Sequence, residues 1–577
     1  MSTIIRGSQL VEHSVRMGVQ SIKGWITLFC CMWLLIFSTT LYVRLDKIHV
    51  ETLYRYCEAW FYRMVWSGDE VKIHVPIRSS VDPHKQYYAT SFIKNGAVLR
   101  ELDAINTIML KSVMQAMLTS LMCIAAWIVV LRKIGSGTKQ ERFIRGSKLV
   151  NYKELIRLVN KYNKKHKYKS NYNIVGIPYP AFSAEKHTLI CGTTGSGKSL
   201  IQKALLEQII ANGDRAIVYD FTGAYVESFY REGKDIILNP FDARGRAWSI
   251  LEEVRHMAEF DTIAAALIGE KWNAKDRFWI EGARIIFKEL CKLHYRAGCK
   301  STKQLLHYLH RADLKELSKD LEGTSAKHLV NPNNKETTMG LMASLASYLS
   351  ALHYVKEPEN GEACFSIKDW IQDSNQDNVV YLSTKANLAS SIYPLISAMM
   401  DIAINNMMNL STNTTKKTWF VFDEIASLNQ LPSLRHGLSV TRNFGGCFVI
   451  GIQERAQLIE IYGKEGADTI TSNCGTKLLL KAGEVATARW SSSLIGSKEI
   501  MSYRENISYG AHEIRDGVNL NQTLTNKEAV LESEFLSMCD LSGYIILPGN
   551  FPTAQIKIKH KSYPVRNLRF MPSMMEI

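Results

Sequence analysis

Two uncharged, apolar runs near the N-terminus constrain this chain more than any other feature. Residues 24–43 and residues 112–131 each form a stretch of 20 residues without a charged side chain, and Lys or Arg borders both. A helix of that length spans about 30 Å, which is the thickness of the hydrocarbon core of a bilayer. A core helix of a soluble protein rarely goes so far without charge, and the apolar region of a signal peptide is shorter. The sequence therefore predicts two transmembrane helices.

The basic residues that flank these runs predict the orientation, because short flanks rich in Lys and Arg remain cytoplasmic. The tail 1–23 and the segment 44–111 each have a net charge of +2, whereas residues 132–169 have +11. We expect a multi-pass membrane protein with both termini in the cytoplasm and an extracytoplasmic loop over 44–111, which is a periplasmic loop if the source is a Gram-negative bacterium. That loop contains a single cysteine, Cys57, so it has no internal disulfide.

The whole chain of 577 residues has a net charge of +15, all of it carried by these three segments, so residues 170–577 are neutral. The strongly basic juxtamembrane segment, 132–175, favours attraction to anionic lipid headgroups. Contact with DNA phosphates is the alternative reading of the same charge. None of the eleven cysteines has the C-x-x-C spacing of a structural zinc site.

Residues 187–199 combine a short buried strand, a glycine-rich loop and the start of a helix. The loop fits the pattern G-x-x-x-x-G-K-[ST] and comprises Gly192, Thr193, Thr194, Gly195, Ser196, Gly197, Lys198 and Ser199. In this strand–loop–helix setting, the backbone N–H groups surround phosphate oxygens and the helix N-terminus adds its positive end. Lys198 is expected to reach the β- and γ-phosphates, and Ser199 to ligate Mg²⁺. The predicted cofactors are ATP and Mg²⁺.

A second apolar strand, 418–422, ends in two carboxylates, Asp423 and Glu424. Asp423 is predicted to hold Mg²⁺, directly or through water. Glu424 is predicted to act as the base for the water that attacks the γ-phosphate, which favours hydrolysis over switching.

Two further candidates follow the second carboxylate. Gln453 comes after the strand-like residues 447–450 and is placed to sense the γ-phosphate, and Arg442 is placed to stabilise the transition-state charge in a neighbouring subunit. By their residue types alone, both are also typical of ordinary surface or capping positions.

The remaining pattern divides the chain around this site. Strand-like stretches at 216–219, 236–238 and 379–383 flank a long region with apolar residues at helical spacing. The predicted fold class is α/β, with a P-loop NTPase domain in two parts, 176–250 and 376–577, and an inserted all-α domain over 251–375.

Several stretches together resemble the type IV secretion coupling proteins, the TraG/TraD family, in particular those of F-type conjugation. Besides the two predicted spans, the stretches that carry the resemblance are HTLICGTTGSGKS, IVYDFTGAYVESFY, DIILNPFDARGRAWSI, WFVFDEIASLNQLPSL, RNFGGCFVIGIQERAQLIEIYG and SYGAHEIRDGV. The P-loop is generic, but this order of motifs is specific and covers nearly the whole chain.

The resemblance implies a RecA/FtsK-like motor that forms a homo-hexamer, hydrolyses ATP, binds single- and double-stranded DNA, and passes a relaxase–DNA substrate to the secretion channel. It also implies that Arg442 is the arginine finger and Gln453 the sensor. F-type relatives often continue into a long extension, acidic at its end, and the sequence ends soon after its last strand-like stretch, so docking through such an extension is not predicted. The alternatives are an FtsK-like DNA translocase and a receptor that recruits protein effectors without pumping DNA.

Overall fold

The computed structural model describes residues 2–66, 72–74, 86–138, 142–269, 277–358, 362–411, 416–508 and 517–573. Contacts within the chain divide it into two compact units. The first comprises residues 1–142 with 502–523, and the second comprises 143–501 with 524–577.

Two long helices dominate the first unit: α1 (Ser2–Arg44) and α4 (Gly96–Thr138). They pack against each other, and Arg44 Nη2 donates to Gln115 Oε1 at 2.6 Å. Ile22–Arg44 and Gly96–Lys133 are long and apolar enough to cross a membrane, and only 0% and 11% of their most apolar windows are buried. A core helix of a soluble protein would be mostly buried. The exposure of these two helices therefore favours the prediction that they cross a membrane.

The segment between these helices folds into a small domain rather than a simple loop. It contains α2 (Lys47–Val65), β1 (Lys72–His74), β2 (Gln86–Tyr88) and α3 (Ala89–Ile93), and β1 pairs with β2 in antiparallel fashion. Ala59, Ile73, Phe92 and Val98 form its core. The predicted periplasmic segment is thus partly folded around apolar contacts of its own.

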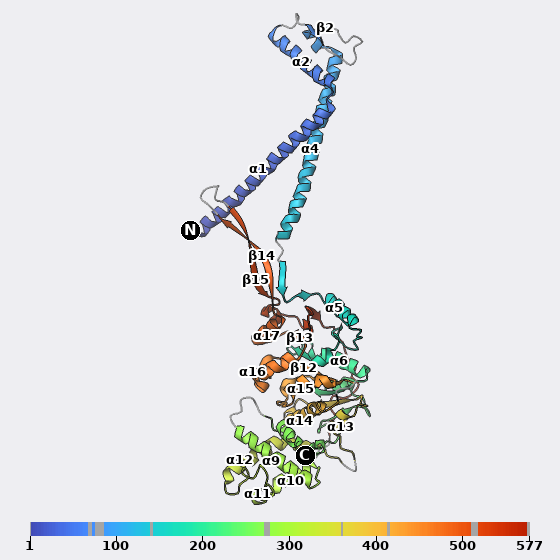
Figure 1. Cartoon of the computed structure of the whole chain (residues 1–577), viewed down its shortest axis with the longest axis vertical. Coiled ribbons are helices and arrows are strands. Elements are labelled where there is room, and N and C mark those ends of the chain that lie inside the picture. Colours follow the sequence, from blue (N-terminus) through green and yellow to red (C-terminus); the bar gives the residue numbers. More distant parts are fainter. Residues whose placement is uncertain are drawn as a thin grey trace. The chain divides into compact units, whose positions relative to one another are not determined.

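A ten-stranded sheet organises the described part of the second unit (Figure 1). The strand order is β4-β17-β16-β13-β7-β12-β11-β8-β10-β9, and the run from β13 to β9 is parallel. In this order the bounds are Leu149–Val150, Thr553–Lys557, Ser542–Ile546, Thr476–Leu480, Thr188–Cys191, Gly446–Ile452, Thr418–Phe422, Arg215–Asp220, Val379–Ser383 and Ile236–Ile237. The predicted strands at 216–219, 236–238, 379–383, 418–422 and 447–450 all belong to this sheet.

Helices bury both faces of the sheet. Successive side chains of a strand point to opposite faces. In β11, Phe420 and Phe422 accordingly join one core with α14, while Trp419 and Val421 join the other with α6. This two-sided burial explains why β11 is an unbroken apolar run. The helices around the sheet are α5 (Tyr152–Lys165), α6 (Lys198–Ala211), α7 (Ala224–Phe229), α14 (Ala389–Met407), α15 (Leu434–Val440), α16 (Arg455–Asn473), α17 (Val485–Ile495) and α18 (Glu532–Leu536).

A group of helices separates β9 from β10, in the predicted all-α region. They are η2 (Ile250–Glu253), α8 (Glu259–Leu267), α9 (Arg277–Arg296), α10 (Thr302–Arg311), α11 (Leu314–Asp320), α12 (Lys335–Leu349), η3 (Ser350–Tyr354) and α13 (Ile367–Gln372). Figure 1 shows α9 to α12 gathered at one end of this unit. The α9 side chains that recur at helical spacing, Ile280, Ala283, Phe287 and Leu290, are buried.

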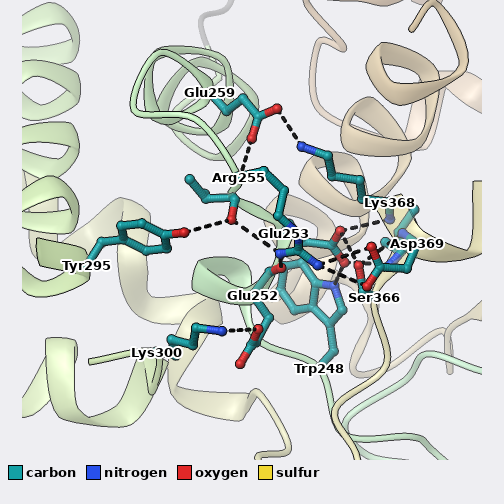
Figure 2. A network of polar contacts seen from close by, with 12 residues as sticks. Trp248, Glu252, Glu253, Arg255, Glu259, Tyr295, Lys300, Ser366, Lys368 and Asp369 are labelled. Atoms are coloured by element: carbon teal, nitrogen blue, oxygen red, sulfur yellow. Dashed lines mark hydrogen bonds and ion pairs between the residues drawn. The ribbon is translucent and has the colours of Figure 1, made fainter. Parts of the chain in front are cut away.

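A buried carboxylate fastens the start of this insertion to its end (Figure 2). Glu253 Oε1 accepts from Trp248 Nε1 at 2.8 Å and from the backbone N–H of Ile367 at 2.6 Å, and Oε2 accepts from the Lys368 N–H at 2.9 Å. Nearby, Lys368 Nζ lies 2.6 Å from Glu259 Oε1. The segment that enters the helical domain and the segment that leaves it are therefore joined by hydrogen bonds where they meet the sheet domain.

The smaller elements complete the described chain. β14 (Ser497–Ser508) and β15 (Gly517–Glu528) form a three-stranded sheet with β3 (Arg142–Gly146), and β5 (Asn173–Ile174) pairs with β6 (Ile177–Pro178). Single turns of 3-10 helix lie at η1 (Ala184–Lys186), η4 (Ile425–Ser427) and η5 (Thr441–Phe444).

Candidate nucleotide site

The strand order brings the predicted site residues to one edge of the sheet. β7 leads into the P-loop, β12 lies beside β7 and leads to Gln453, and β11 lies beside β12 and leads to Asp423. Because these strands are parallel, their carboxyl ends meet at the same edge, where ligands of open α/β sheets bind. Thr194 and Gln453, 259 residues apart in sequence, are in hydrogen-bond contact at 3.3 Å.

The P-loop has the backbone that its glycines allow. Gly195 and Gly197 have φ of +81° and +110°, which is left-handed backbone that favours glycine. Gly197 directly precedes α6, and a Cβ there would lie 2.8 Å from Ile558 Cδ1. A side chain at Gly197 would therefore both strain the backbone and meet Ile558, which explains the glycine at the start of the helix.

The Lys198 ammonium is held over this loop. Its Nζ donates to the carbonyl oxygens of Gly192 at 2.6 Å and Thr193 at 3.2 Å. Burial lowers the pKa of Lys198, and the nearby Glu424 carboxylate opposes that effect. The ammonium group therefore lies at the loop, where the sequence predicts that it reaches the phosphates.

Two oxygen ligands suitable for Mg²⁺ lie close together: Ser199 is in the first turn of α6, and Asp423 directly follows β11. Ser199 Oγ lies 3.0 Å from Asp423 Oδ1, although the two residues are 224 positions apart. A hydroxyl and a carboxylate are hard oxygen donors of the kind that Mg²⁺ prefers. Burial raises the pKa of Asp423, while its hydrogen bonds from Ser199 and Tyr225 lower it. The donor set fits a magnesium ion.

Glu424 is the least satisfied polar group of the site. Its side chain is 8% exposed, and neither carboxylate oxygen makes a hydrogen bond of normal length and angle. Burial raises the pKa of Glu424 to about 7, and the charge of Lys198 and the approach of the Gln453 amide limit the rise. A carboxylate that ionises near neutral pH and has free lone pairs is suited to general-base chemistry.

Arg442 lies away from this edge of its own chain. It is exposed in η5, which precedes β12, whereas the site follows β12. The seven residues of β12 place about 20 Å between the two ends. Burial lowers the pKa of His187, which precedes β7 at that opposite edge, and the charge of Arg442 adds to the lowering. The structure therefore brings Gln453, but not Arg442, to the chain's own P-loop.

Three buried residues that the sequence did not single out complete the site. Tyr225 of α7 and Gln202 of α6 contact each other at 2.5 Å, and the Tyr225 hydroxyl also lies 3.1 Å from Asp423 Oδ1. Asp220 ends β8, the strand beside β11. A carboxylate directly after a buried strand was a usable signal for Asp220, since the same signal marked Asp423. Tyr225 and Gln202 had no such signal.

Comparison with known proteins identifies the family. The model of the type IV secretion-system coupling protein DNA-binding domain matches residues 171–559. The chain belongs to the type IV secretion-system coupling protein family. It is 30% identical to coupling protein TraD of Escherichia coli (strain K12), over 98% of this chain and 79% of that protein. Family membership makes it a nucleotide-binding coupling ATPase of conjugative DNA transfer.

Solved structures of the coupling protein TrwB have the same fold as this chain. A TrwB form in complex with sulphate matches with a TM-score of 0.66 and 26% identity, covering 75% of this chain and 97% of that one. TrwB in complex with a non-hydrolysable ATP analogue matches at 0.66 and 25%, covering 75% and 98%. TrwB with ADP and Mg²⁺ matches at 0.65 and 26%, with the same coverage. The predicted P-loop motor with an inserted all-α domain is confirmed.

Proposed function

We propose that this coupling protein hydrolyses ATP with Lys198 and the P-loop on the phosphates and with Mg²⁺ between Ser199 and Asp423. The observation that carries the proposal is the 3.0 Å approach of Ser199 Oγ to Asp423 Oδ1, beside a buried carboxylate that ionises near neutral pH. A bound Mg²⁺ ion would offset the negative charge of the phosphate oxygens. One solved structure of the relative TrwB is a complex with ADP and Mg²⁺.

Glu424 is the base in this scheme. A water beside the γ-phosphate gives its proton to a Glu424 oxygen as the water oxygen bonds to phosphorus, and the bond to the ADP oxygen breaks. Gln453 is the sensor, because its amide lies between the P-loop residue Thr194 and Glu424. A hydrogen bond from that amide to the γ-phosphate would report whether ATP or ADP is bound.

The arginine finger comes from a neighbouring copy. Arg442 is exposed at the edge of the sheet opposite its own P-loop, so in a ring of copies it is free to face the site of the next subunit. A guanidinium at that place stabilises the charge that develops on the transferred phosphoryl group. This arrangement supports a homo-hexamer in which each site is completed by its neighbour.

The membrane segment and the partners follow from the family and from the charge pattern. We place α1 and α4 across the bacterial inner membrane, with both termini and the ATPase domain in the cytoplasm, because the basic excess lies there. DNA is expected to stimulate hydrolysis, and the relaxase–DNA complex to be delivered to the secretion channel. The family favours this role over an FtsK-like translocase and over a receptor that moves only protein effectors.

A subunit-mixing experiment tests the shared site. Arg442→Ala subunits retain Lys198, and Lys198→Ala subunits retain Arg442, so each homo-oligomer should be inactive. Mixing the two should restore part of the ATPase activity at the mixed interfaces, measured with and without single-stranded DNA. Arg435→Ala, which changes an exposed arginine of the neighbouring helix α15, is the matched control and should be active alone.

The outcomes separate the parts of the proposal. No recovery on mixing, with subunit exchange verified, would overturn the shared site. Full activity of Lys198→Ala alone would overturn the nucleotide site itself. Activity that is restored by mixing but unchanged by DNA would remove DNA stimulation from the scheme.

A further inference from the structure

Three secondary-structure elements meet around the Asp423 carboxylate, and only two of them belong to the P-loop and Asp-Glu motifs. The third is α7, whose Tyr225 is fully buried and points its hydroxyl at Asp423 Oδ1 from 3.1 Å. The same carboxylate oxygen accepts from Ser199 Oγ at 3.0 Å. Two hydroxyls from separate elements therefore converge on one oxygen of the Asp423 carboxylate.

Gln202 fixes the position of this hydroxyl. Its amide nitrogen donates to the Phe422 carbonyl oxygen at 2.9 Å, which turns its Oε1 toward the Tyr225 hydroxyl at 2.5 Å. Gln202 is itself fully buried, and Phe422 directly precedes Asp423. One side chain of the P-loop helix thus holds both the strand end that carries Asp423 and the tyrosine that contacts it.

The backbone of α7 is held as firmly as its tyrosine. Asp220 Oδ2 accepts from the N–H groups of Tyr225 at 2.8 Å and Val226 at 2.9 Å. From the C-terminal segment, Arg566 N donates to the Glu227 carbonyl oxygen at 2.9 Å, and Arg569 Nε lies 3.0 Å from Glu227 Oε1. Tyr225 therefore cannot move away from Asp423 without breaking contacts on both sides of α7.

We propose that Tyr225 is a positioning residue for Mg²⁺: its hydroxyl holds the Asp423 carboxylate in the orientation that faces Ser199. The proposal rests on the magnesium site of the proposed function. The hydroxyl has one proton and two acceptors, Gln202 Oε1 at 2.5 Å and Asp423 Oδ1 at 3.1 Å, so the two acceptors share it and the contact with Asp423 is the longer one. Without it, Asp423 is free to rotate away from Ser199, and each encounter with the ion must first restore the binding orientation.

Hydrogen bonds to metal ligands from the surrounding shell typically change metal affinity by 10- to 100-fold. For Tyr225→Phe, we expect roughly a tenfold rise in the Mg²⁺ concentration that gives half-maximal effect. The affinity for ATP in EDTA should be unchanged, because the P-loop is not altered. The turnover number at saturating Mg²⁺ should approach that of the wild type, since the base and the loop remain in place.

The test uses the full-length protein in detergent and the Mg²⁺ ion as the probe. ATP affinity is measured in EDTA and across a Mg²⁺ titration, and the ATPase rate is measured across the same titration. Tyr230→Phe is the matched control, because Tyr230 ends the same helix and its ring faces Tyr381 rather than Asp423. Asp423→Asn provides the reference for a lost ligand and should abolish the Mg²⁺ dependence.

The outcomes distinguish this inference from the proposed function. A shift of the Mg²⁺ midpoint in Tyr225→Phe, with ATP binding in EDTA retained and no shift in Tyr230→Phe, supports the positioning role. An unchanged midpoint in Tyr225→Phe beside a Mg²⁺-dependent wild type overturns it. Equal weakening of ATP binding in EDTA and in Mg²⁺ also overturns it, because that pattern indicates a structural role. A wild type that shows no Mg²⁺ dependence refutes the magnesium site itself.

Discussion

Replacing Glu424 with Gln should abolish hydrolysis and yet stabilise the nucleotide-free protein at alkaline pH. Burial raises the pKa of Glu424 from 4.5 to about 7, so the folded chain keeps a proton that the unfolded chain releases. The stability contributed by the neutral carboxyl is fully present below pH 4.5 and is lost as the pH rises through 7. At about 1.4 kcal/mol for each tenfold change in proton affinity, the loss is roughly 3 kcal/mol by pH 8.

Glutamine is neutral at every pH and is free of this penalty. Its amide group also needs a hydrogen-bond acceptor in a site where the carboxylate has no well-formed partner, which costs about 1 kcal/mol. The expected net gain for Glu424→Gln is therefore about 2 kcal/mol at pH 8, with little or no gain at pH 5. Nucleotide binding should persist, whereas the ATPase rate should fall by roughly 10²- to 10⁴-fold because the base is lost.

Urea unfolding of the nucleotide-free protein at pH 5 and pH 8 measures the difference, with ATP binding and turnover measured in parallel. Glu460→Gln, a change of an exposed carboxylate on α16, is the control and should alter neither stability nor its pH dependence. If Glu424→Gln is no more stable than the wild type at pH 8, or if the gain is the same at both pH values, the buried-charge reasoning is refuted. Retained turnover would refute the role of Glu424 as the base.

Other substitutions have equally direct expectations. Lys198→Ala and Ser199→Ala should each abolish ATP turnover in a steady-state assay, because the phosphate cation or the metal ligand is lost, and full activity in either would remove that residue from the site. Glu253→Ala should lower the free energy of unfolding by roughly 3–5 kcal/mol, since it leaves three buried N–H donors unpaired at the root of the helical insertion. Glu253→Gln keeps an acceptor oxygen and should lower it by less. Equal losses in the two variants would contradict this account. Removal of residues 1–131 should leave a protein that still binds ATP. Its specific ATPase activity should rise with protein concentration or with added single-stranded DNA, because the membrane no longer concentrates the subunits. A total ATPase rate that is strictly proportional to protein concentration would contradict a shared site.

The sequence by itself predicted the elements that are proposed to carry the chemistry. A P-loop needs only a strand, a glycine-rich turn and a helix in immediate succession, so its signal is local and residues 192–199 could be proposed in full. Asp423 and Glu424 could be proposed for a similar reason. A strand that is buried on both faces is an unbroken apolar run, and the two carboxylates directly follow that run. The membrane helices were predicted by length and lack of charge, since the bilayer sets a minimum span.

Only the tertiary structure decided which of these residues share a site. β12 lies between β7 and β11, which places Gln453 beside Thr194 and Glu424, and the same strand carries Arg442 to the opposite edge. Strand order in a parallel sheet depends on long crossover connections, which leave no periodic pattern in the sequence. Tyr225 and Gln202 illustrate the same limit: each is a buried residue of an ordinary-looking helix. They gain their proposed role only because packing brings α6 and α7 together around the end of β11.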